Sequence, residues 1–226
     1  MLRWLLTCQK AEGQDMTVRL VIADAADLIR VGMGAVLVAR PEYSVEASVG
    51  TLADLMAAVA SKPHVAVIDE RLDPDADILH IVEGVGEAAP QTRLLVSGYL
   101  RDGLLIRDLF AAGCQGYLYK GDQLETSLPY AIDNALRERP FLSVTANTEY
   151  LVAMQTPQRD WQLDREARRV LRRLAQGQHV GQIALELDLS PRRVYWIREK
   201  LRDRFGAVTN EHMISRAAAE GFIFPS

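Results

Sequence analysis

The chain has 226 residues, of which 49% are hydrophobic and 25% charged, and its formal net charge is −4. These values fit a globular protein long enough for two small domains, and they exclude a disordered or fibrous chain. The charge is unevenly divided, because residues 161–226 hold 12 Arg and Lys against 8 Asp and Glu (+4), which leaves −8 for residues 1–160. A basic C-terminal part suits a polyanionic partner such as nucleic acid; a merely solvated basic face is the alternative that charge alone leaves open.

The N-terminal segment and the cysteines indicate a cytoplasmic protein. The apolar run from Leu2 to Leu6 is too short for a signal-peptide core or a membrane span, so residues 1–16 are expected to form a loose extension. Cys8 and Cys114 are too few for a disulfide framework or a metal cluster, which implies a reducing compartment. We expect no contact with a membrane.

Residues 17–139 alternate between short apolar runs and segments with helical spacing. Such alternation predicts an α/β fold with a doubly wound, five-stranded parallel sheet covered by helices on both faces. The expected strands are 18–23, 44–49, 64–68, 94–96 and 116–119, and the expected helices are 28–38, 52–60, 78–85, 104–112 and 124–137.

Polar residues stand at the carboxyl ends of four of these strands. Asp24, Asp69, Ser97 and Lys120 each end or follow an apolar run. Functional groups of open α/β sheets gather beyond the carboxyl ends of the strands, so these four side chains are expected to converge on one pocket.

This part of the chain resembles the CheY-like receiver domain of bacterial two-component response regulators. The resemblance rests on VIAD at 21–24, VAVID at 65–69, LLVS at 94–97 and AAGCQGYLYK at 111–120. It implies that Asp69 is the phosphoacceptor, that Ser97 bonds the phosphoryl group and that Lys120 neutralises its charge. It also places Asp24 in the phosphorylation pocket and Tyr117 at the position of a rotating aromatic residue.

Two departures from the family pattern make this an atypical, orphan-like receiver. The family has two adjacent acids after the first strand, whereas Asp24 is followed by Ala25, so Asp24 and Asp69 remain as ligands for a weakened Mg²⁺ site. Asp27 is a candidate replacement for the missing acid. The loop after Asp69, ERLDPDAD, also lacks the usual Met-Pro-Gly pattern. The alternative is an Asp69–Lys120 ion pair that holds the pocket without phosphoryl transfer.

The remainder of the chain predicts a linker and a helical domain. Residues 140–160 are rich in polar and small residues and contain Pro140 and Pro157, which predicts a linker with one or two helical turns between 145 and 154. The domain at 161–226 is expected to hold four helices, and Gly177 and Gly206 mark helix ends. The expected helices are 163–177, two within 180–204, and 211–220 with Asn210 as its cap.

The segment 180–204 has the pattern of a helix-turn-helix. Ser190 is suited to cap the second helix, and Pro191 suits its first position. Apolar residues recur at spacings of three and four, which predicts one buried stripe on each helix. The residues are Ile183, Ala184 and Leu187 on the first helix and Val194, Ile197 and Leu201 on the second.

The whole segment resembles the LuxR-type DNA-binding domain of the NarL/FixJ family. The resemblance rests on Val170-Leu171, Leu174 to Gly177, Ile183-Ala184, Leu187, Leu189-Ser190, Val194, Leu201 and Gly206. It implies that the second helix enters the major groove of promoter DNA. Tyr195, Trp196 and Glu199 would then face base edges, and Arg192, Arg193 and Lys200 would lie near phosphates. The alternative for Trp196 is packing against the first helix of the domain.

The resemblance implies a dimeric, non-enzymatic transcription regulator. The dimer surface is expected on the last helix, with Met213, Ile214 and Ala217, or on the first and fifth helices of the receiver. The alternative for Met213, Ile214 and Ala217 is that they close the core of their own domain. The partner is a second copy, giving a homodimer, or a related regulator, giving a heterodimer; a histidine kinase is the expected phosphoryl source. A signalling adaptor that no longer reads DNA is the second functional hypothesis, and an α/β enzyme with Asp69 as nucleophile is the third.

Overall fold

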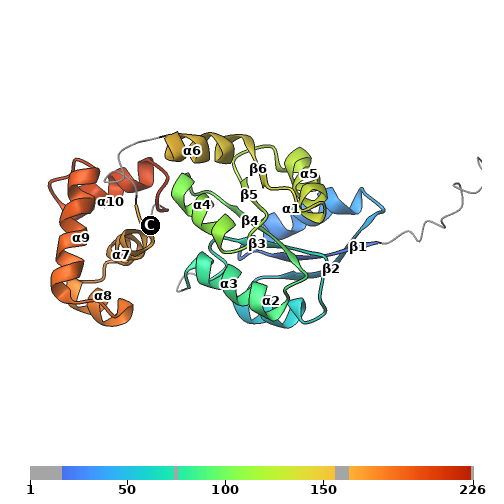
Figure 1. Cartoon of the computed structure of the whole chain (residues 1–226), viewed down its shortest axis with the longest axis horizontal. Coiled ribbons are helices and arrows are strands. Elements are labelled where there is room, and N and C mark those ends of the chain that lie inside the picture. The colour runs from blue at the N-terminus through green and yellow to red at the C-terminus, as the bar shows by residue number, and fades with distance from the viewer. Residues whose placement is uncertain (1–16, 74–75, 156–162, 225–226) are drawn as a thin grey trace, which may run out of the picture.

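The computed structural model describes residues 17–73, 76–155 and 163–224. A parallel sheet with helices on both faces is followed by a bundle of short helices, and the two parts lie side by side (Figure 1). The predicted extension at 1–16, with Leu2, Leu6 and Cys8, and Pro157 of the predicted linker lie outside the described residues. None of the helices in the described part of the chain is both long and apolar enough to cross a lipid bilayer.

The sheet has six parallel strands in the order β2-β1-β3-β4-β5-β6. The prediction of five strands was therefore one short, because a two-residue strand extends the edge beside β5. The doubly wound parallel sheet itself is confirmed. The strands are β1 (Val18–Ala23), β2 (Tyr43–Val49), β3 (Val65–Asp69), β4 (Arg93–Gly98), β5 (Gly116–Tyr119) and β6 (Phe141–Leu142).

Alternate residues of the strands enter two separate cores. On one face, Leu20 and Ile22 of β1 pack with α1 and α5, and on the other, Val21 and Ala23 pack with α2, α3 and α4. Both faces are apolar because side chains of a strand alternate in direction and both sides are covered. These helices are α1 (Asp27–Val38), α2 (Leu52–Val59), α3 (Ile78–Ala88), α4 (Gly103–Ala111) and α5 (Leu124–Leu136).

The segment 141–155 packs on the receiver sheet and on α4. β6 is followed by α6 (Val144–Gln155), a full helix where only one or two turns were expected. α6 lies so close to α4 that a Cβ atom at Gly103 would be 2.2 Å from the carbonyl oxygen of Glu149. The rings of Phe110 and Tyr150 meet edge to face, with centroids 6.0 Å apart. One surface of α4 is therefore covered by the chain's own helix.

The C-terminal domain is built from α7 (Arg165–Ala175), α8 (Val180–Leu187), α9 (Pro191–Arg204) and α10 (Asn210–Ala219). The two predicted apolar stripes are buried in its core. The Ser190 hydroxyl accepts a hydrogen bond from the amide of Arg193, as expected of a cap. Asp188 adopts φ +53° in the turn between α8 and α9. Thr209, rather than Asn210, caps α10, because its hydroxyl accepts from the amide of His212.

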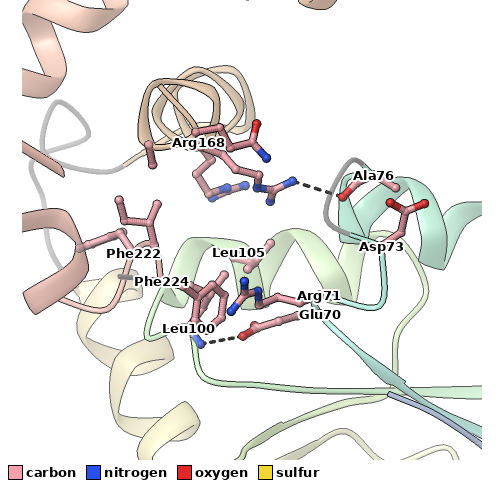
Figure 2. Close-up of a pocket in the computed structure, with 13 residues that line it drawn as sticks. Glu70, Arg71, Asp73, Ala76, Leu100, Leu105, Arg168, Phe222 and Phe224 are labelled. Atoms are coloured by element: carbon pink, nitrogen blue, oxygen red, sulfur yellow. Dashed lines mark hydrogen bonds between the residues drawn. The ribbon is translucent and has the colours of Figure 1, made fainter. Parts of the chain in front are cut away.

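The two domains contact each other through α7 and the C-terminal segment. Figure 2 shows α7 and this segment facing α4 and the loop after β3 across a cavity. The amide of Arg101 donates a hydrogen bond to the carbonyl of Gly221 (2.9 Å), which joins the segment before α4 to the end of the chain. Arg165 of α7 lies 3.3 Å from Glu83 of α3.

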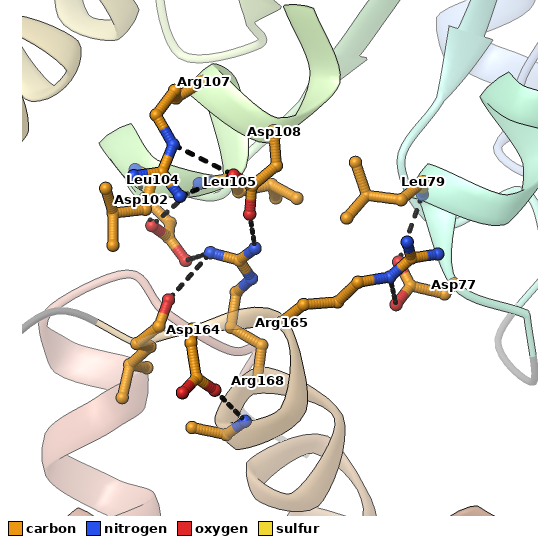
Figure 3. A network of polar contacts seen from close by, with 12 residues as sticks. Asp77, Leu79, Asp102, Leu104, Leu105, Arg107, Asp108, Asp164, Arg165 and Arg168 are labelled. Atoms are coloured by element: carbon orange, nitrogen blue, oxygen red, sulfur yellow. Dashed lines mark hydrogen bonds and ion pairs between the residues drawn. The ribbon is translucent and has the colours of Figure 1, made fainter. Parts of the chain in front are cut away.

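Arg168 is at the centre of this contact. Its guanidinium projects from α7 toward α4, where Nη1 lies 3.5 Å from Asp102 and Nη2 pairs with Asp108 (Figure 3). Only 9% of its side chain is exposed, and Nη1 also donates to the carbonyl of Leu163. Asp102 at the same time caps α4, accepting from the amides of Leu104 and Leu105. One buried charge cluster therefore positions the C-terminal domain and the start of α4 together.

Candidate functional site

Asp24, Asp69 and Lys120 meet at the carboxyl edge of the sheet. β1 and β3, the two strands that flank the point where strand order reverses, place the two acids side by side, and β5 brings the lysine. Lys120 Nζ lies 2.5 Å from Asp24 Oδ2 and 2.6 Å from Asp69 Oδ1, and the exposures of these side chains are 3%, 1% and 8%. The structure thus assembles the cluster expected from the strand ends, with the ammonium bridging both carboxylates.

Ser97 joins the cluster from β4, where it pairs in register with Asp69. Its hydroxyl oxygen is buried and has no hydrogen-bond partner among the described residues. A buried hydroxyl without a partner carries a desolvation cost that a bound acceptor would relieve. Ser97 is thus placed as the resemblance implies, next to the expected phosphoacceptor.

The electrostatics of the cluster are set by burial and by the two ion pairs. Burial opposes the charged form of Lys120, but contact with Asp69 and Asp24 outweighs it and raises the pKa of the lysine. Burial also raises the pKa of the Asp69 carboxyl, and Lys120 counteracts that rise. Two carboxylates and one ammonium leave a net negative charge of one in the pocket, and the lysine lies between the two carboxylates that carry it.

The carboxylates present do not fit the magnesium site that the receiver family implies. Ala25 supplies no ligand, and the Asp27 carboxylate, at the exposed start of α1, accepts from the amide of Leu28 (2.8 Å). Among the described residues no group of three or more acidic, His or Cys side chains is gathered as a metal site. Mg²⁺ demands near-ideal octahedral oxygen ligands, and the two carboxylates here are already bridged by an ammonium.

Glu70 is a pocket residue that the sequence did not single out. Its side chain is buried, Oε1 accepts from the amides of Tyr99 (2.5 Å) and Leu100 (3.0 Å), and Oε2 accepts from the Tyr117 hydroxyl (2.5 Å). Burial raises the pKa of this carboxyl to about 7, and the three donors only partly oppose the rise. The space exists because residue 98 is glycine, where a Cβ atom would lie 1.9 Å from the Glu70 carboxyl carbon.

Tyr117 is held inward by this acid. The residue is 1% exposed, and its hydroxyl lies between Glu70 and the carbonyl of Leu100, 3.1 Å away. The aromatic side chain at the position of the rotating residue is therefore bonded to the residue that follows Asp69. Burial raises the pKa of the Tyr117 hydroxyl well above its ordinary value, so it remains a hydrogen-bond donor at neutral pH.

The basic helix α9 presents its polar face to solvent. Tyr195 and Trp196 are 50% and 48% exposed, so Trp196 does not pack into the domain core. Its ring lies between two cations, with Arg193 4.5 Å and Lys200 4.2 Å from the ring centre, and Arg198 lies 4.7 Å from the ring of Tyr195. Cation–π contacts of this kind hold aromatic rings flat on a helix surface.

Ion pairs within the domain engage part of the same face. Arg193 donates to Glu166 of α7 through Nε (2.9 Å) and Nη2 (2.5 Å). Glu199 pairs with its neighbours Arg198 (3.1 Å) and Arg202 (2.9 Å). Arg192 is exposed at the start of the helix. The six predicted DNA-contacting residues thus share one exposed surface.

The dimer surfaces expected from sequence differ in exposure. On α10, Met213 and Ala217 are buried in the core of their own domain, and Ile214 packs against that core. On the receiver, α1 and α5 lie next to each other and carry exposed apolar side chains. These are Leu28, Val31 and Val38 on α1 and Tyr130 and Leu136 on α5.

Comparisons with known proteins agree with this geometry. No protein-family model matches the chain. The DNA-binding transcriptional activator DevR/DosR of Mycobacterium tuberculosis is 33% identical over 105 residues, which are 46% of this chain and 48% of the relative. The chain thus matches about half the length of that curated relative.

Solved structures with a similar fold are two-domain regulators. RcsB of Salmonella enterica serovar Typhimurium, bound to promoter rprA with the phosphomimetic BeF3−, is 17% identical with a TM-score of 0.69, over 88% of this chain and 98% of that one. A structure of two RcsB dimers on two parallel DNAs has 16% identity and a TM-score of 0.59, over 90% and 98%. The response regulator ChrA of a heme-sensing two-component system has 20% identity and a TM-score of 0.51, over 92% and 100%.

The fold is that of a receiver followed by a helix-turn-helix domain. Its particular form, a parallel sheet with an acid–lysine pocket and a four-helix C-terminal domain, is the fold shared with the solved response regulators RcsB and ChrA.

Glu70 makes the stability of the protein depend on pH. Its pKa is about 7 in the folded protein against an ordinary 4.5, so the unfolded state releases the proton first and rising pH favours unfolding between about pH 4.5 and 7. In wild type the free energy of unfolding should fall by up to about 3 kcal/mol over this range. Glu70→Gln, which mimics the protonated form, should not show this fall. Denaturant unfolding at pH 5 and pH 8 measures it, with the exposed Glu87→Gln as control. Equal losses in wild type and Glu70→Gln would show that Glu70 is already ionised at pH 5.

Proposed function

We propose that this protein is a DNA-binding transcription regulator that reads promoter DNA through α9. The observation that carries the proposal is an exposed face of Arg192, Arg193, Tyr195, Trp196 and Lys200 on a helix whose other side is buried in a helix-turn-helix core. The relative DevR/DosR is a DNA-binding transcriptional activator, and RcsB has been solved on promoter DNA; both support the proposal.

The residues of α9 divide into two roles. Arg192, Arg193 and Lys200 neutralise phosphates and set the position of the helix, without reading sequence. Tyr195 and Trp196 contact thymine methyl groups, and Glu199 accepts from cytosine amino groups. On binding, Arg193 exchanges its ion pair with Glu166 for one with a phosphate. Its contribution to the free energy of DNA binding is therefore the difference between these two ion pairs.

Fluorescence anisotropy over a salt series, with promoter fragments selected from a genomic library, separates these roles. Arg193→Ala should weaken binding to every duplex and reduce the slope of log affinity against log salt by about 1. Glu199→Ala should leave the slope unchanged but change which base pair is preferred. The discrimination against the wrong base pair that is lost should be about 1–3 kcal/mol. Arg137→Ala, on the receiver, is the matched control. An unchanged slope in a folded Arg193→Ala protein contradicts the assignment, and absence of DNA binding by wild type favours the adaptor hypothesis.

We further propose that the Asp69 pocket is a degenerate phosphorylation site. In this proposal Lys120 bridges Asp24 and Asp69, offsets one of their two negative charges and occupies the space between the two carboxylates. The lack of a second acid beside Asp24 supports it, whereas the partnerless Ser97 hydroxyl favours the competing role of Asp69 as phosphoacceptor. In that role the carboxylate attacks phosphorus and the donor's leaving group departs.

Incubation with acetyl phosphate and Mg²⁺ decides between these roles. We expect the intact mass and the oligomeric state to be unchanged, because a two-carboxylate site bridged by lysine binds Mg²⁺ weakly. The matched control is Asp69→Asn under the same conditions. A gain of one phosphoryl group in wild type that is lost in Asp69→Asn would contradict the proposal and make the protein an ordinary substrate of a histidine kinase.

The protein is proposed to bind DNA as a dimer through α1 and α5. A single helix-turn-helix covers a short site, so paired half-sites require two copies. The exposed Leu28, Val31 and Tyr130 support this surface over α10, whose apolar stripe closes its own domain. The second subunit is another copy or a related regulator. Sedimentation of the purified protein on DNA distinguishes them, because dimers formed by this chain alone count against an obligate heterodimer.

A further inference from the structure

A cavity of about 180 Å³ lies between the two domains, away from the exposed face of α9 and bordered by Glu70, the residue that follows Asp69. Figure 2 shows it bounded by α7, the C-terminal segment, α4 and the loop after β3. Its walls come from residues far apart in the sequence, so it exists only while the domains are docked. Its lining includes Arg71, Leu100, Leu105, Arg172, Phe222 and Phe224.

One wall of the cavity is apolar and partly aromatic. Leu100 and Leu105 come from the receiver, and Phe222 and Phe224 come from the segment after α10. Apolar cavities of roughly 150 Å³ accept a benzene ring. The size and the lining therefore suit one six-membered ring.

The other wall carries two guanidinium groups, Arg71 and Arg172, that form no ion pair with a carboxylate of the described residues. Arg71 lies over the ring of Phe224, 4.1 Å from its centre, and Arg172 donates one hydrogen bond, to the carbonyl of Ala76 (3.3 Å). Among the described residues neither forms an ion pair, in contrast to Arg168, which is held by two carboxylates. Burial lowers the pKa of Arg172, with partial compensation from Asp77. A half-buried cation of this kind gains from an incoming anion.

We propose that this cavity binds a monocyclic aromatic carboxylate, with its ring against Leu100, Leu105 and Phe222 and its carboxylate on Arg172. Guanidinium groups hold carboxylates through paired, charge-assisted hydrogen bonds, which explains the preference for an anion over a neutral ring. The proposal does not depend on DNA binding or on phosphorylation.

Binding in this cavity acts on both domains. A ligand that contacts the receiver and the C-terminal segment at once binds only the docked arrangement and stabilises it by mass action. Glu70 and Arg71, which directly follow Asp69, line the same cavity. The ligand therefore contacts the loop that directly follows Asp69 of the acid–lysine pocket.

Isothermal titration of the full chain with benzoate and phenylacetate tests the site. We expect saturable binding of one molecule per chain, and at least about tenfold weaker binding of the neutral benzamide and the cationic benzylamine. Arg172→Gln and Phe224→Ala should each weaken carboxylate binding by at least about tenfold. Arg169→Gln is the matched control, because this arginine lies on the same helix outside the cavity.

The stability of the variants without ligand is the control for loss of folding. Arg172→Gln removes a charge whose burial cost is only partly compensated by Asp77, so the variant should be folded and about as stable as wild type. A large loss of stability would show that the guanidinium serves the fold, and would overturn the proposal. Absence of saturable binding of either acid at millimolar concentration, or equal binding by wild type, Arg172→Gln and Phe224→Ala, would overturn it as well.

Discussion

The buried ion cluster of Arg168 with Asp102 and Asp108 is the contact on which the arrangement of the molecule depends. Arg168 is 9% exposed and Asp102 3%, so removal of one partner would leave an uncompensated charge in a low-dielectric environment. Losses of that kind cost about 3–5 kcal/mol. Asp102 also caps α4, so the cluster joins the start of a receiver helix to the first helix of the C-terminal domain. The position of the helix-turn-helix follows from this cluster.

A continuous set of contacts leads from the acid–lysine pocket to this domain boundary. Asp69 is followed by Glu70, whose carboxylate accepts from the amides of Tyr99 and Leu100. The next residue, Arg101, donates its amide to Gly221 after α10. Three consecutive positions before α4, Tyr99 to Arg101, thus contact Glu70 at one end and the C-terminal domain at the other. Any change in the pocket that moves Glu70 acts on the segment that holds the two domains together.

Much of the fold was predictable because strong local patterns agree with the tertiary structure. Alternating apolar runs placed five strands, and the Ser190-Pro191 start and the apolar stripes placed α9. The convergence of Asp24, Asp69 and Lys120 followed from strand ends alone. β6 escaped prediction because Phe141–Leu142 is too short to show a period of two. The length of α6 also escaped, because Val144 and Leu151 are exposed and the helix has no clear apolar stripe.

The missed residues owe their roles to tertiary contacts. Glu70 looks like the first polar residue of a loop, and only in the folded chain does the missing Cβ of Gly98 make room for its carboxylate. The arginines of α7 look like a solvated helix face, yet Arg168 is buried against two acids that lie 66 and 60 positions earlier in the chain. Sequence periodicity carries no information about which distant carboxylates a basic helix will meet.

Calorimetric unfolding of Arg168→Met beside wild type tests the central claim that the two domains are one unit held by this cluster. Methionine keeps the packing of the stem and removes the charge, and Arg169→Met, on the same helix, is the control. The account predicts one cooperative transition for wild type and the control, and two separated transitions for Arg168→Met. Two transitions in wild type, or one unchanged transition in Arg168→Met, would contradict it.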